Sequence, residues 1–374
     1  MAERHPTSDF VVIGGGIVGA SIAYGLAKSG EKVLLLDEGD VAFRAARGNL
    51  GNVWVQGKGA TSHAYADLTR NAANRWGGFA AALQEETGID LHFRRPGAFY
   101  ICFSEEELER RSGMMASINE HATVRSEFET VGPEELRRRL PEIGPEIAGA
   151  TYCPDDGTAN PLFLLRALIK AAAGFGATYL PRRKVVSLCR DGEGICIETE
   201  AGTFHAGRVV LAAGLGNGKL APQLGMTAPV RPVRGQIMVT EKVRKFLDFG
   251  TNFIRQTVEG GCVFGESSEE AGFDEGTTLS VLRETARRAV TAFPLLRDAR
   301  VVRAWGALRI MTPDGVPVYQ QAPGAGNVFL ITVHSGVTLA PFHAGEMAVA
   351  LRQNRLDPDR YLPFSPERFN VQAA

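Results

Sequence analysis

Hydrophobic positions near the start of the chain follow a regular order of short runs and helical spacing. Phe10–Ile13 is an apolar run, three glycines follow it, and "ASIAYGLAKSG" then has a composition compatible with a helix. A second apolar run ends with Leu34–Leu36 and is followed directly by the acid Asp37. Short apolar runs bounded by turn residues are typical of buried strands. The segment from Phe10 to Asp37 therefore predicts a strand, a glycine turn, a helix and a second strand.

Later segments repeat this alternation. A buried strand ending at Ala-Ala-Gly is predicted within "GRVVLAAGLGNGKLAPQLG" (207–225), preceded by the strands "RRKVVSL" and "GICIETEAGTFHA". "NVFLITVHSGVTLAPFHAGEMAVALRQN" predicts a strand, a turn and a helix. The charged segments "SEEELERRSGMMASINEH" and "VGPEELRRRLPEI" indicate helices, and "GCVFGESSEE" indicates a strand before the helical "TTLSVLRETARRAVTAF". Turn-rich joints separate these blocks at Arg94–Gly97, Pro141–Gly149, Cys153–Pro161 and Pro229–Pro232.

Length and composition indicate the number of domains and the class of binding partner. The 374 residues suit two domains. Because 41 Lys plus Arg nearly balance 42 Asp plus Glu, no net charge favours nucleic acid or an anionic membrane, and we expect a small-molecule partner. The five cysteines show no CxxC pair or metal-like spacing, which predicts a reduced, cytoplasmic protein without a metal site. No apolar segment has signal-peptide character or membrane-spanning length, so we expect a soluble protein.

Gly14, Gly16 and Gly19 form the pattern G-x-G-x-x-G between the first strand and the helix. The first glycine permits a tight turn, the second lets backbone approach a pyrophosphate, and the third allows close helix–strand packing. Asp37 follows at the distance from which a carboxylate accepts hydrogen bonds from ribose hydroxyls. The alternative is an ordinary loop, with Asp37 capping a surface strand. The complete order of elements favours a dinucleotide site, and the fingerprint does not distinguish NAD from FAD.

The choice between NAD and FAD depends on segments farther along the chain. The ordered set of "GRVVLAAGLGNGKLAPQLG", "YCPDDGTANPLFLLRALIKAAAGFGA", "PVRPVRGQIMV", "WGALRIMTPDGVPV" and the C-terminal strand, turn and helix resembles the FAD-dependent amino acid oxidoreductase superfamily. This superfamily includes D-amino acid oxidase, glycine oxidase and sarcosine oxidase, and the resemblance covers almost the entire chain. Within it, "HSGVTLAP" is most similar to bacterial subgroups that dehydrogenate opines or D-hydroxyproline.

The resemblance implies an α/β fold with a Rossmann-like FAD-binding domain and a substrate domain. The FAD-binding domain is expected to be discontinuous, over residues 1–90, 148–226 and 302–374. The substrate domain is expected over 91–147 and 227–301, as a mainly antiparallel sheet with flanking helices.

The resemblance also implies the cofactor contacts. The expected cofactor-binding residues are Gly14, Gly16, Ile17, Val18, Gly19, Asp37, Glu38, Arg47, Gly48, Asn49, Gly51, Val185, Val186, Ala213, Gly214, Gly306, Ser335, Gly336, Val337 and Thr338. Asp37 stands in place of the family's usual Glu and keeps the ribose-binding chemistry, while Ala45 and Ala46 stand where many relatives have serines. Sarcosine oxidases attach flavin through a cysteine at the position of Ala307, so we expect non-covalent FAD here.

Oxidising an amine beside a carboxylate requires a group that binds the carboxylate and a positive field near the flavin pyrimidine. Arg309, in "WGALRIMTPDG", matches the carboxylate-binding arginine of glycine oxidase-like enzymes, and its guanidinium can bind both carboxylate oxygens. The alternative is a solvent-facing strand arginine. Amides of the turn 334–338, at the start of a helix whose early turn suits Pro341, are expected to supply the positive field.

Other candidate residues carry open alternatives. His334 is assigned to the catalytic site as a structural hydrogen bonder, with substrate orientation or a base role as the alternative. Arg255 and Gln256, in "NFIRQT", are candidate substrate contacts, or else exposed. Trp54 and Gln56 are candidates for lining the flavin face, with core packing as the alternative for Trp54.

The resemblance implies oxidation of a C–N bond in an amino acid, secondary amine or opine, by hydride transfer to flavin N5, giving an imine that hydrolyses to a keto acid. One alternative is oxidation of a 2-hydroxy acid, which needs His334 as a base. Another is a flavin-bearing subunit of a larger dehydrogenase, and a homo-oligomer is also open. Sarcosine oxidases place an oxygen-activating lysine in a strand matched by "GCVFGESS", where Cys262, Val263 and Phe264 carry no charge. We therefore expect weak oxidase activity, with the physiological acceptor open.

Overall fold

The computed structural model describes residues 8–39, 45–265, 267–324 and 326–370. Its largest sheet has eight strands, with the main order β17-β18-β11-β1-β2-β8. These strands are β1 (Ser8–Ile13), β2 (Val33–Leu36), β8 (Thr178–Leu180), β11 (Gly202–Leu211), β17 (Val318–Gln321) and β18 (Val328–Thr332). All run parallel except β17, which is antiparallel to β18. The N-terminal strand, turn, helix and strand are confirmed, with α1 (Ile17–Lys28) as the helix.

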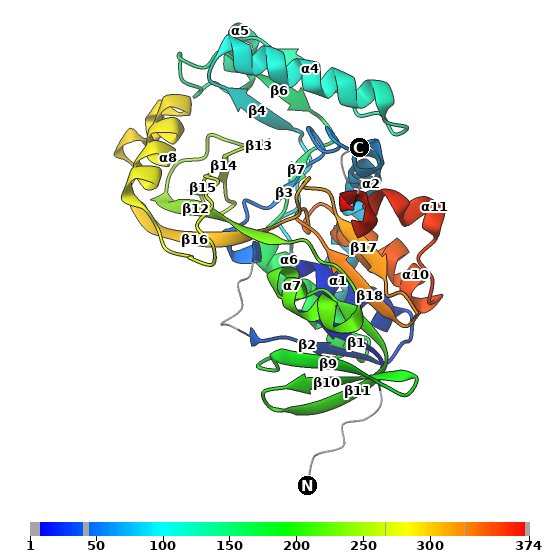
Figure 1. The fold of residues 1–374 in the computed structure, drawn as a ribbon. Helices are drawn as coiled ribbons and strands as arrows, with labels where there is room; N and C mark the ends of the chain where they lie inside the picture. The colour runs from blue at the N-terminus through cyan, green and yellow to red at the C-terminus, as the bar shows by residue number, and fades with distance from the viewer. Residues whose placement is uncertain (1–7, 40–44, 266, 325, 371–374) are drawn as a thin grey trace.

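Both faces of this sheet are covered, which explains its continuous apolar runs. Val12 and Leu35 point into a core shared with α1 and the C-terminal helices. Val11 and Leu34 point into a second core, closed by β9 (Val185–Asp191) and β10 (Gly194–Thr199). The layers are visible in Figure 1, where β9 and β10 lie below β1 and β2.

Two predicted elements differ in detail. β11 is one strand, so "TFHA" continues into "GRVVL" and does not belong to the preceding strand, because β10 pairs with its first half and β1 with its second. The C-terminal helix is divided into α9 (Ala340–Phe342), the π-helical turn η6 (His343–Met347) and α10 (Ala348–Arg352). This turn passes very close to α1, since a Cβ on Gly25 would lie 2.0 Å from the Ala344 carbonyl oxygen. The wider π turn accompanies this close backbone contact.

Two further sheets lie above and to one side of the large sheet (Figure 1). The first has the order β14-β15-β12-β16 and is antiparallel throughout. The second has the order β13-β4-β6-β5 and is antiparallel except between β13 and β4. Their bounds are β4 (Ala98–Cys102), β5 (Glu129–Val131), β6 (Gly149–Cys153), β12 (Arg231–Lys242), β13 (Gly250–Thr251), β14 (Ile254–Gln256), β15 (Gly261–Phe264) and β16 (Val301–Met311).

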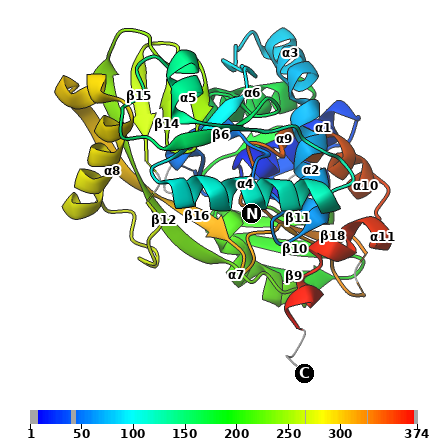
Figure 2. The same cartoon turned by 90° about the horizontal axis from the view of Figure 1, so that it is seen from above.

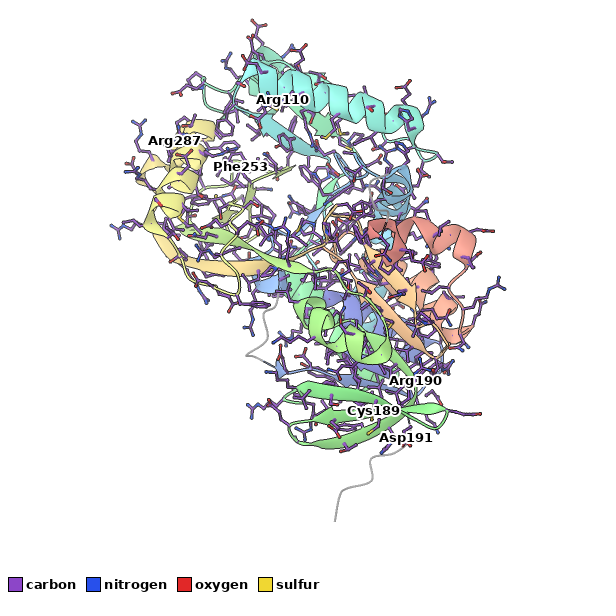
Figure 3. All side chains as sticks on the ribbon, in the orientation of Figure 1. Arg110, Cys189, Arg190, Asp191, Phe253 and Arg287 are labelled. Carbon is purple, nitrogen blue, oxygen red and sulfur yellow. The ribbon has the colours of Figure 1, made fainter. Side chains whose placement is uncertain are left out.

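Helices surround these sheets. The charged predicted helices correspond to α4 (Glu105–His121), α5 (Pro133–Arg139) and α8 (Leu279–Ala292). The remaining elements are β3 (Asn52–Val53), α2 (His63–Asn74), α3 (Trp76–Thr87), β7 (Gly157–Thr158), α6 (Pro161–Gly174), α7 (Asn217–Leu220) and α11 (Pro358–Tyr361). Seen from above, α8 lies at one edge of the molecule and α1 and α10 lie at the opposite side (Figure 2). Figure 3 shows Arg110 of α4 and Arg287 of α8 at the periphery, whereas Phe253 lies inside and is buried.

The α/β fold class with a Rossmann-like sheet and a mainly antiparallel second part is confirmed. The predicted domain boundaries at 148 and 302 fall at the starts of β6 and β16, and both strands pair with strands of the expected substrate domain. Sheet membership groups these two strands with the substrate domain. The two-domain division itself remains a proposal.

Candidate cofactor and active site

The glycine turn leaves the N-terminus of α1 open. Gly16 is the N-cap of α1 and offers no side-chain cap, and a Cβ added to it would meet nothing within 4 Å. Gly14 and Gly19 are instead required by packing. Gly14 has a φ of 109°, and a Cβ added to it would lie 2.4 Å from the Ala212 carbonyl oxygen. A Cβ added to Gly19 would lie 1.9 Å from the Gly14 carbonyl oxygen. The first amides of α1 therefore face open space, as a phosphate site requires.

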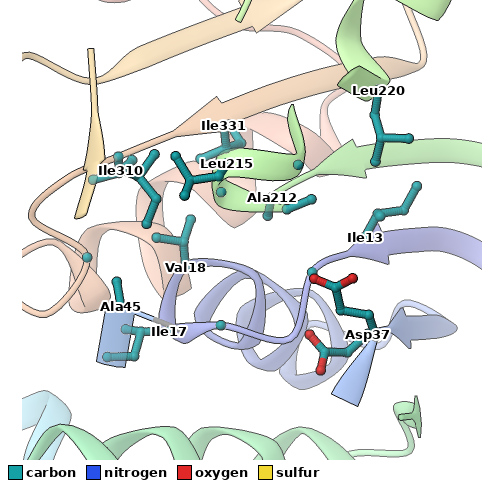
Figure 4. Close-up of a pocket in the computed structure, with 18 of the residues that line it drawn as sticks. Ile13, Ile17, Val18, Asp37, Ala45, Ala212, Leu215, Leu220, Ile310 and Ile331 are labelled. Carbon is teal, nitrogen blue, oxygen red and sulfur yellow. The ribbon is translucent and has the colours of Figure 1, made fainter. Parts of the chain in front are cut away.

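Asp37 is buried at the end of β2 and holds this turn together. Its Oδ2 accepts a hydrogen bond of 2.7 Å from the Gly15 amide, and its Oδ1 accepts one of 2.8 Å from the Gly39 amide. A carboxylate oxygen has more than one acceptor site, so both oxygens can still accept from a ligand hydroxyl. Figure 4 shows Asp37 beside the start of α1, at the wall of a cavity.

This cavity has a volume of about 370 Å³ and runs along the ends of β1, β2, β11 and β18. It brings together most of the predicted cofactor residues, namely Gly14, Gly16, Ile17, Val18, Asp37, Glu38, Asn49, Val185, Val186, Ala213, Gly214, Gly336 and Val337, together with His334. Residues far apart in the chain thus line one site, because parallel strands place their carboxyl ends at one edge.

Other predicted cofactor residues do not line the cavity. They are Gly19, Arg47, Gly48, Gly51, Gly306, Ser335 and Thr338. Several have structural contacts instead: Ser335 accepts a hydrogen bond of 2.7 Å from the Tyr65 hydroxyl, and Thr338 Oγ1 accepts one of 3.0 Å from the Trp54 amide. Gly48 packs against Ala307, where a Cβ on the glycine would lie 2.0 Å from the alanine methyl group. These contacts support the walls around the cavity.

Some lining residues were not predicted. They are Ile13, Leu36, Ala45, Ala46, Arg183, Lys184, Ala212, Leu215, Gly216, Lys219, Leu220, Ile310, Ile331 and Val333. Most are apolar residues, for which the sequence pattern does not separate cavity walls from core packing. For Ala45 and Ala46, the only signal in the sequence is that they stand where many relatives have serines.

His334 lies at the cavity wall, in the turn that precedes α9. Burial, together with the positive charges of Lys58 and Arg309, lowers its pKa from 6.5 to about 3. The imidazole is therefore neutral at physiological pH and is a weak base.

Arg309 comes from β16, and its guanidinium lies over Gly235 of β12. Its Nη1 donates a hydrogen bond of 2.7 Å to the Ser267 carbonyl oxygen. Its charge is one of the causes that lower the pKa of His334, after burial and the charge of Lys58, and the next residue of the strand, Ile310, lines the cavity.

Arg255 and Gln256 lie elsewhere. Both line a second, smaller cavity, with His92 and Lys245 among its other residues. Arg255 Nη1 donates a hydrogen bond of 2.8 Å to the Ala159 carbonyl oxygen, and Gln256 bonds to the backbone of the 243–247 segment and of Gly260. We leave both residues out of the proposed substrate site.

Trp54 and Gln56 do not line the cofactor cavity either. Gln56 is 1% exposed and donates a hydrogen bond of 2.6 Å from Nε2 to Asp156 Oδ2. It also accepts one of 2.9 Å from the Thr151 hydroxyl. These contacts make Gln56 a support for the loop after β3.

Comparison with known proteins decides the family. The family model described as FAD dependent oxidoreductase matches residues 9–351. The chain belongs to this family. It is 41% identical over 367 residues to one of the opine oxidase subunits of Agrobacterium tumefaciens (strain Ach5), covering 98% of this chain and 99% of the relative. It is 28% identical to glycine oxidase of Bacillus subtilis (strain 168), covering 91% of each.

The solved structures agree with this assignment. The crystal structure of glycine oxidase from Geobacillus kaustophilus has a TM-score of 0.89 with this chain, at 26% identity, covering 96% of this chain and 98% of that one. The superfamily resemblance found in the sequence is thus confirmed. The chain is an FAD-dependent oxidoreductase.

The cavity of this oxidoreductase fits FAD on its own residues. The open N-terminus of α1 suits the pyrophosphate, Asp37 and Glu38 suit a ribose, and apolar walls such as Ile310 suit a planar ring system.

Within the described ranges, no helix is long and apolar enough to cross a membrane. The same residues contain no cluster of three or more His, Cys, Asp or Glu side chains suited to a metal ion.

FAD should not be attached covalently through the Ala307 position. Ala307 is buried and lies against Gly48, and its methyl group cannot form a thioether. Acid or heat precipitation of the yellow protein should release the flavin into the supernatant, where its absorbance is measured. Colour retained in a thoroughly denatured pellet would contradict this expectation, as would a colourless protein that binds NAD tightly.

Proposed function

We propose that this enzyme oxidises the C–N bond of an amine that carries a carboxylate: an amino acid, a secondary amine or an opine. The product is an imine, which water hydrolyses to a keto acid and an amine. The observation that carries the proposal is that β16 brings Ile310 to the wall of the cofactor cavity and carries Arg309 as the adjacent residue. His334 lines the same cavity, and the charge of Arg309 contributes to its lowered pKa. The opine oxidase and glycine oxidase relatives support the same substrate chemistry.

Arg309 would bind the substrate carboxylate. Its planar guanidinium presents several N–H donors in a fork that matches the two oxygens of a carboxylate. The Nη1 contact to the Ser267 carbonyl oxygen fixes the direction of this fork. Bound FAD supplies a two-electron acceptor for the hydrogen on the carbon next to nitrogen. The role of the chain is to hold that carbon in place, and this needs no dedicated nucleophile.

His334 would orient the substrate as a neutral hydrogen-bonding group. Because its pKa is lowered to about 3, its imidazole is poorly suited to take a proton from an alcohol. Oxidation of a 2-hydroxy acid needs such a base, so this alternative is disfavoured. Amine oxidation needs only a neutral substrate nitrogen, which a bound amine reaches by losing its proton to solvent or a nearby base.

Function as one subunit of a larger enzyme is a second candidate. The observation that favours it is the opine oxidase relative, which is itself one subunit of an enzyme and matches over 98% of this chain. Inactivity of the purified chain with every artificial acceptor, although FAD is bound, would favour this candidate over a self-sufficient enzyme.

A substrate screen tests the proposed reaction. Purified holoenzyme would be assayed with a dye acceptor and, in parallel, for oxygen consumption. The substrates would be N-(carboxyalkyl) amino acids, N-alkyl glycines, primary amino acids and 2-hydroxy acids. Turnover of at least one carboxylated amine, with a keto acid as product, is expected. Turnover of 2-hydroxy acids alone would overturn the proposal.

The dye-linked rate should exceed the oxidase rate. The strand β15 carries Cys262, Val263 and Phe264 where sarcosine oxidases carry the oxygen-activating lysine, and burial raises the pKa of the Cys262 thiol to about 11. These side chains carry no charge at neutral pH and cannot stabilise developing negative charge on oxygen. The measurement is hydrogen peroxide formation beside dye reduction with the same substrate. Peroxide formation as fast as dye reduction would refute this expectation.

A further inference from the structure

Lys58 lies in a short loop between β3 and α2, and hydrogen bonds to the buried Asp156 hold this loop in place. The Val55 amide donates a hydrogen bond of 2.5 Å to Asp156 Oδ1, and Gln56 Nε2 donates one of 2.6 Å to Asp156 Oδ2. The Lys58 amide itself donates one of 3.0 Å to the Val55 carbonyl oxygen. Asp156 is fully buried, so the carboxylate anchors the loop from inside the protein. The backbone that carries Lys58 is therefore fixed.

The ammonium group of Lys58 has no hydrogen-bond acceptor among the described residues. Within the ranges that the structure describes, no hydrogen bond or ion pair involves its Nζ, although the residue is partly buried. The charges that act on it are Arg111, which is also positive, and Asp156. Arg111 lies over the Tyr100 ring at 4.1 Å, and its Nη2 donates to Gln56 Oε1 at 3.5 Å. Burial and Arg111 lower the pKa of Lys58 to about 8, while burial raises the pKa of Asp156 to about 7.

Lys58 and Arg309 reach His334 from different parts of the fold. Lys58 comes from the loop anchored through Gln56 to Thr151 of β6, whereas Arg309 comes from β16 and lies over Gly235 of β12. The segment that carries Lys58 is tied to the turn that carries His334 on both sides of the lysine. The Trp54 amide donates a hydrogen bond of 3.0 Å to Thr338 Oγ1, and the Tyr65 hydroxyl donates one of 2.7 Å to Ser335 Oγ. In agreement with this placement, the charges of Lys58 and Arg309 both lower the pKa of His334. Neither residue lines the cofactor cavity, while His334 does. The substrate of the proposed reaction would lie beside His334, within reach of the loop that carries Lys58 and the strand that carries Arg309.

We propose that Lys58 binds a second carboxylate of the substrate, so that the enzyme prefers amines with one carboxylate for Arg309 and another for Lys58. This inference rests on the proposed function and refines its substrate class to doubly anionic secondary amines. A carboxylate is the simplest group that supplies a negatively charged hydrogen-bond acceptor, which the Lys58 ammonium does not have among the described residues. The ammonium on its flexible stem acts as a point charge and tolerates variation in the length of the substrate.

The test compares two substrates that differ in one carboxylate. One is an N-(1-carboxyethyl) amino acid, and the other is the N-ethyl amino acid with the same side chain. In Lys58→Met, which keeps much of the stem length, kcat/KM for the first substrate should fall about tenfold to several hundredfold, and kcat/KM for the second should change less than about threefold. Lys32→Met, at an exposed position, is the matched control and should change neither value.

Other outcomes separate the possible failures. An equal fall in kcat/KM for both substrates in Lys58→Met would show that Lys58 has a structural role. No fall in kcat/KM for either substrate would show that Lys58 does not contact the substrate. Either result would overturn the inference. Arg309→Ala should lower kcat/KM for both substrates. If the wild-type enzyme oxidises neither substrate, the proposed function fails at this point, and binding still tests Lys58.

Binding is measured on holoenzyme through the change in flavin absorbance, with glutarate as the dicarboxylate and butyrate as the monocarboxylate. Wild type should bind glutarate at least about tenfold more tightly than butyrate, and Lys58→Met should abolish this preference. Equal affinity for the two ligands in wild type would overturn the inference.

The preference should also depend on pH. Lys58 is the group that titrates. The guanidinium groups of Arg111 and Arg309 are not deprotonated in proteins. His334 stays neutral well above its pKa of about 3, and Asp156 is ionised above its raised pKa. The glutarate preference should therefore be present at neutral pH and decline as pH rises past the Lys58 pKa of about 8. In the complex the decline should occur at a higher pH, because a bound carboxylate favours the charged form of Lys58 and raises its pKa. Lys58→Arg keeps its charge and should retain the preference in alkaline solution. A wild-type preference that stays unchanged as pH rises well past this pKa would contradict the assignment.

Discussion

Replacing Arg309 with alanine should lower kcat/KM for the carboxylated substrate on the order of thirtyfold to several thousandfold. The substrate carboxylate would be desolvated without its partner, and losing one member of such a pair costs roughly 2 to 5 kcal/mol, where about 1.4 kcal/mol is tenfold. FAD content should stay near wild type, because Arg309 does not line the cofactor cavity. Steady-state kinetics and the ratio of flavin to protein absorbance check both statements.

Two variants make this result specific. Arg309→Lys should recover only part of the activity, because a point charge cannot reproduce the bidentate fork. Arg303→Ala removes an exposed arginine from the same strand and should behave like wild type. If Arg309→Ala oxidises its substrate normally, the carboxylate is bound elsewhere, and Lys58, the other cation that acts on His334, becomes the first residue to test.

Gly19→Ala should prevent stable FAD binding and lower stability, whereas Gly16→Ala should impair FAD binding alone. At Gly19 the new Cβ would lie 1.9 Å from a backbone oxygen, so α1 and the glycine turn must move apart. At Gly16 the Cβ enters open space at the helix N-terminus, where it would meet only a ligand. Overpacking by one methyl group costs roughly 1 to 3 kcal/mol, so the FAD affinity of Gly16→Ala should fall about fivefold to 150-fold.

Flavin content and thermal unfolding of the apoprotein separate the two effects. Gly113→Ala, in α4, is the control, because its Cβ would also meet nothing within 4 Å and it is far from the cofactor cavity in the sequence and in the fold. Its melting temperature and flavin content should match or exceed those of wild type. Normal flavin content in Gly16→Ala would show that the helix N-terminus does not approach the cofactor.

The cofactor half of the site could be predicted because its signals are local. The run from Phe10 to Asp37 contains a strand, a glycine turn, a helix and an acid in fixed order, and each has a steric or electrostatic reason visible in the sequence. The Rossmann-like sheet and the positions of Gly14 and Asp37 followed from it. The cavity walls at Ile310, near the end of β16, and Leu220, at the end of α7, carry no such signal, since an apolar residue at the end of a strand or helix serves a core equally well.

The substrate half was harder to predict because its residues meet only in three dimensions. From the sequence, Arg255 is a candidate substrate contact or else exposed, yet the fold of β14 and β15 directs it to the Ala159 carbonyl oxygen. Lys58 is not among the predicted site residues, although it stands in "QGKG" shortly after the predicted flavin loop. The signal was a cation between two glycines; its lack of an acceptor emerges only when Asp156 and Arg111 are placed around it.

The cavity for FAD is lined by residues from Ile13 to Val337, and this span has a consequence for biosynthesis. During translation the N-terminal glycine turn emerges early, yet the cavity is complete only after β18 and the turn that follows it have left the ribosome. FAD must therefore enter after that point, and a ribosome that stalls before residue 337 releases a chain that cannot retain the cofactor.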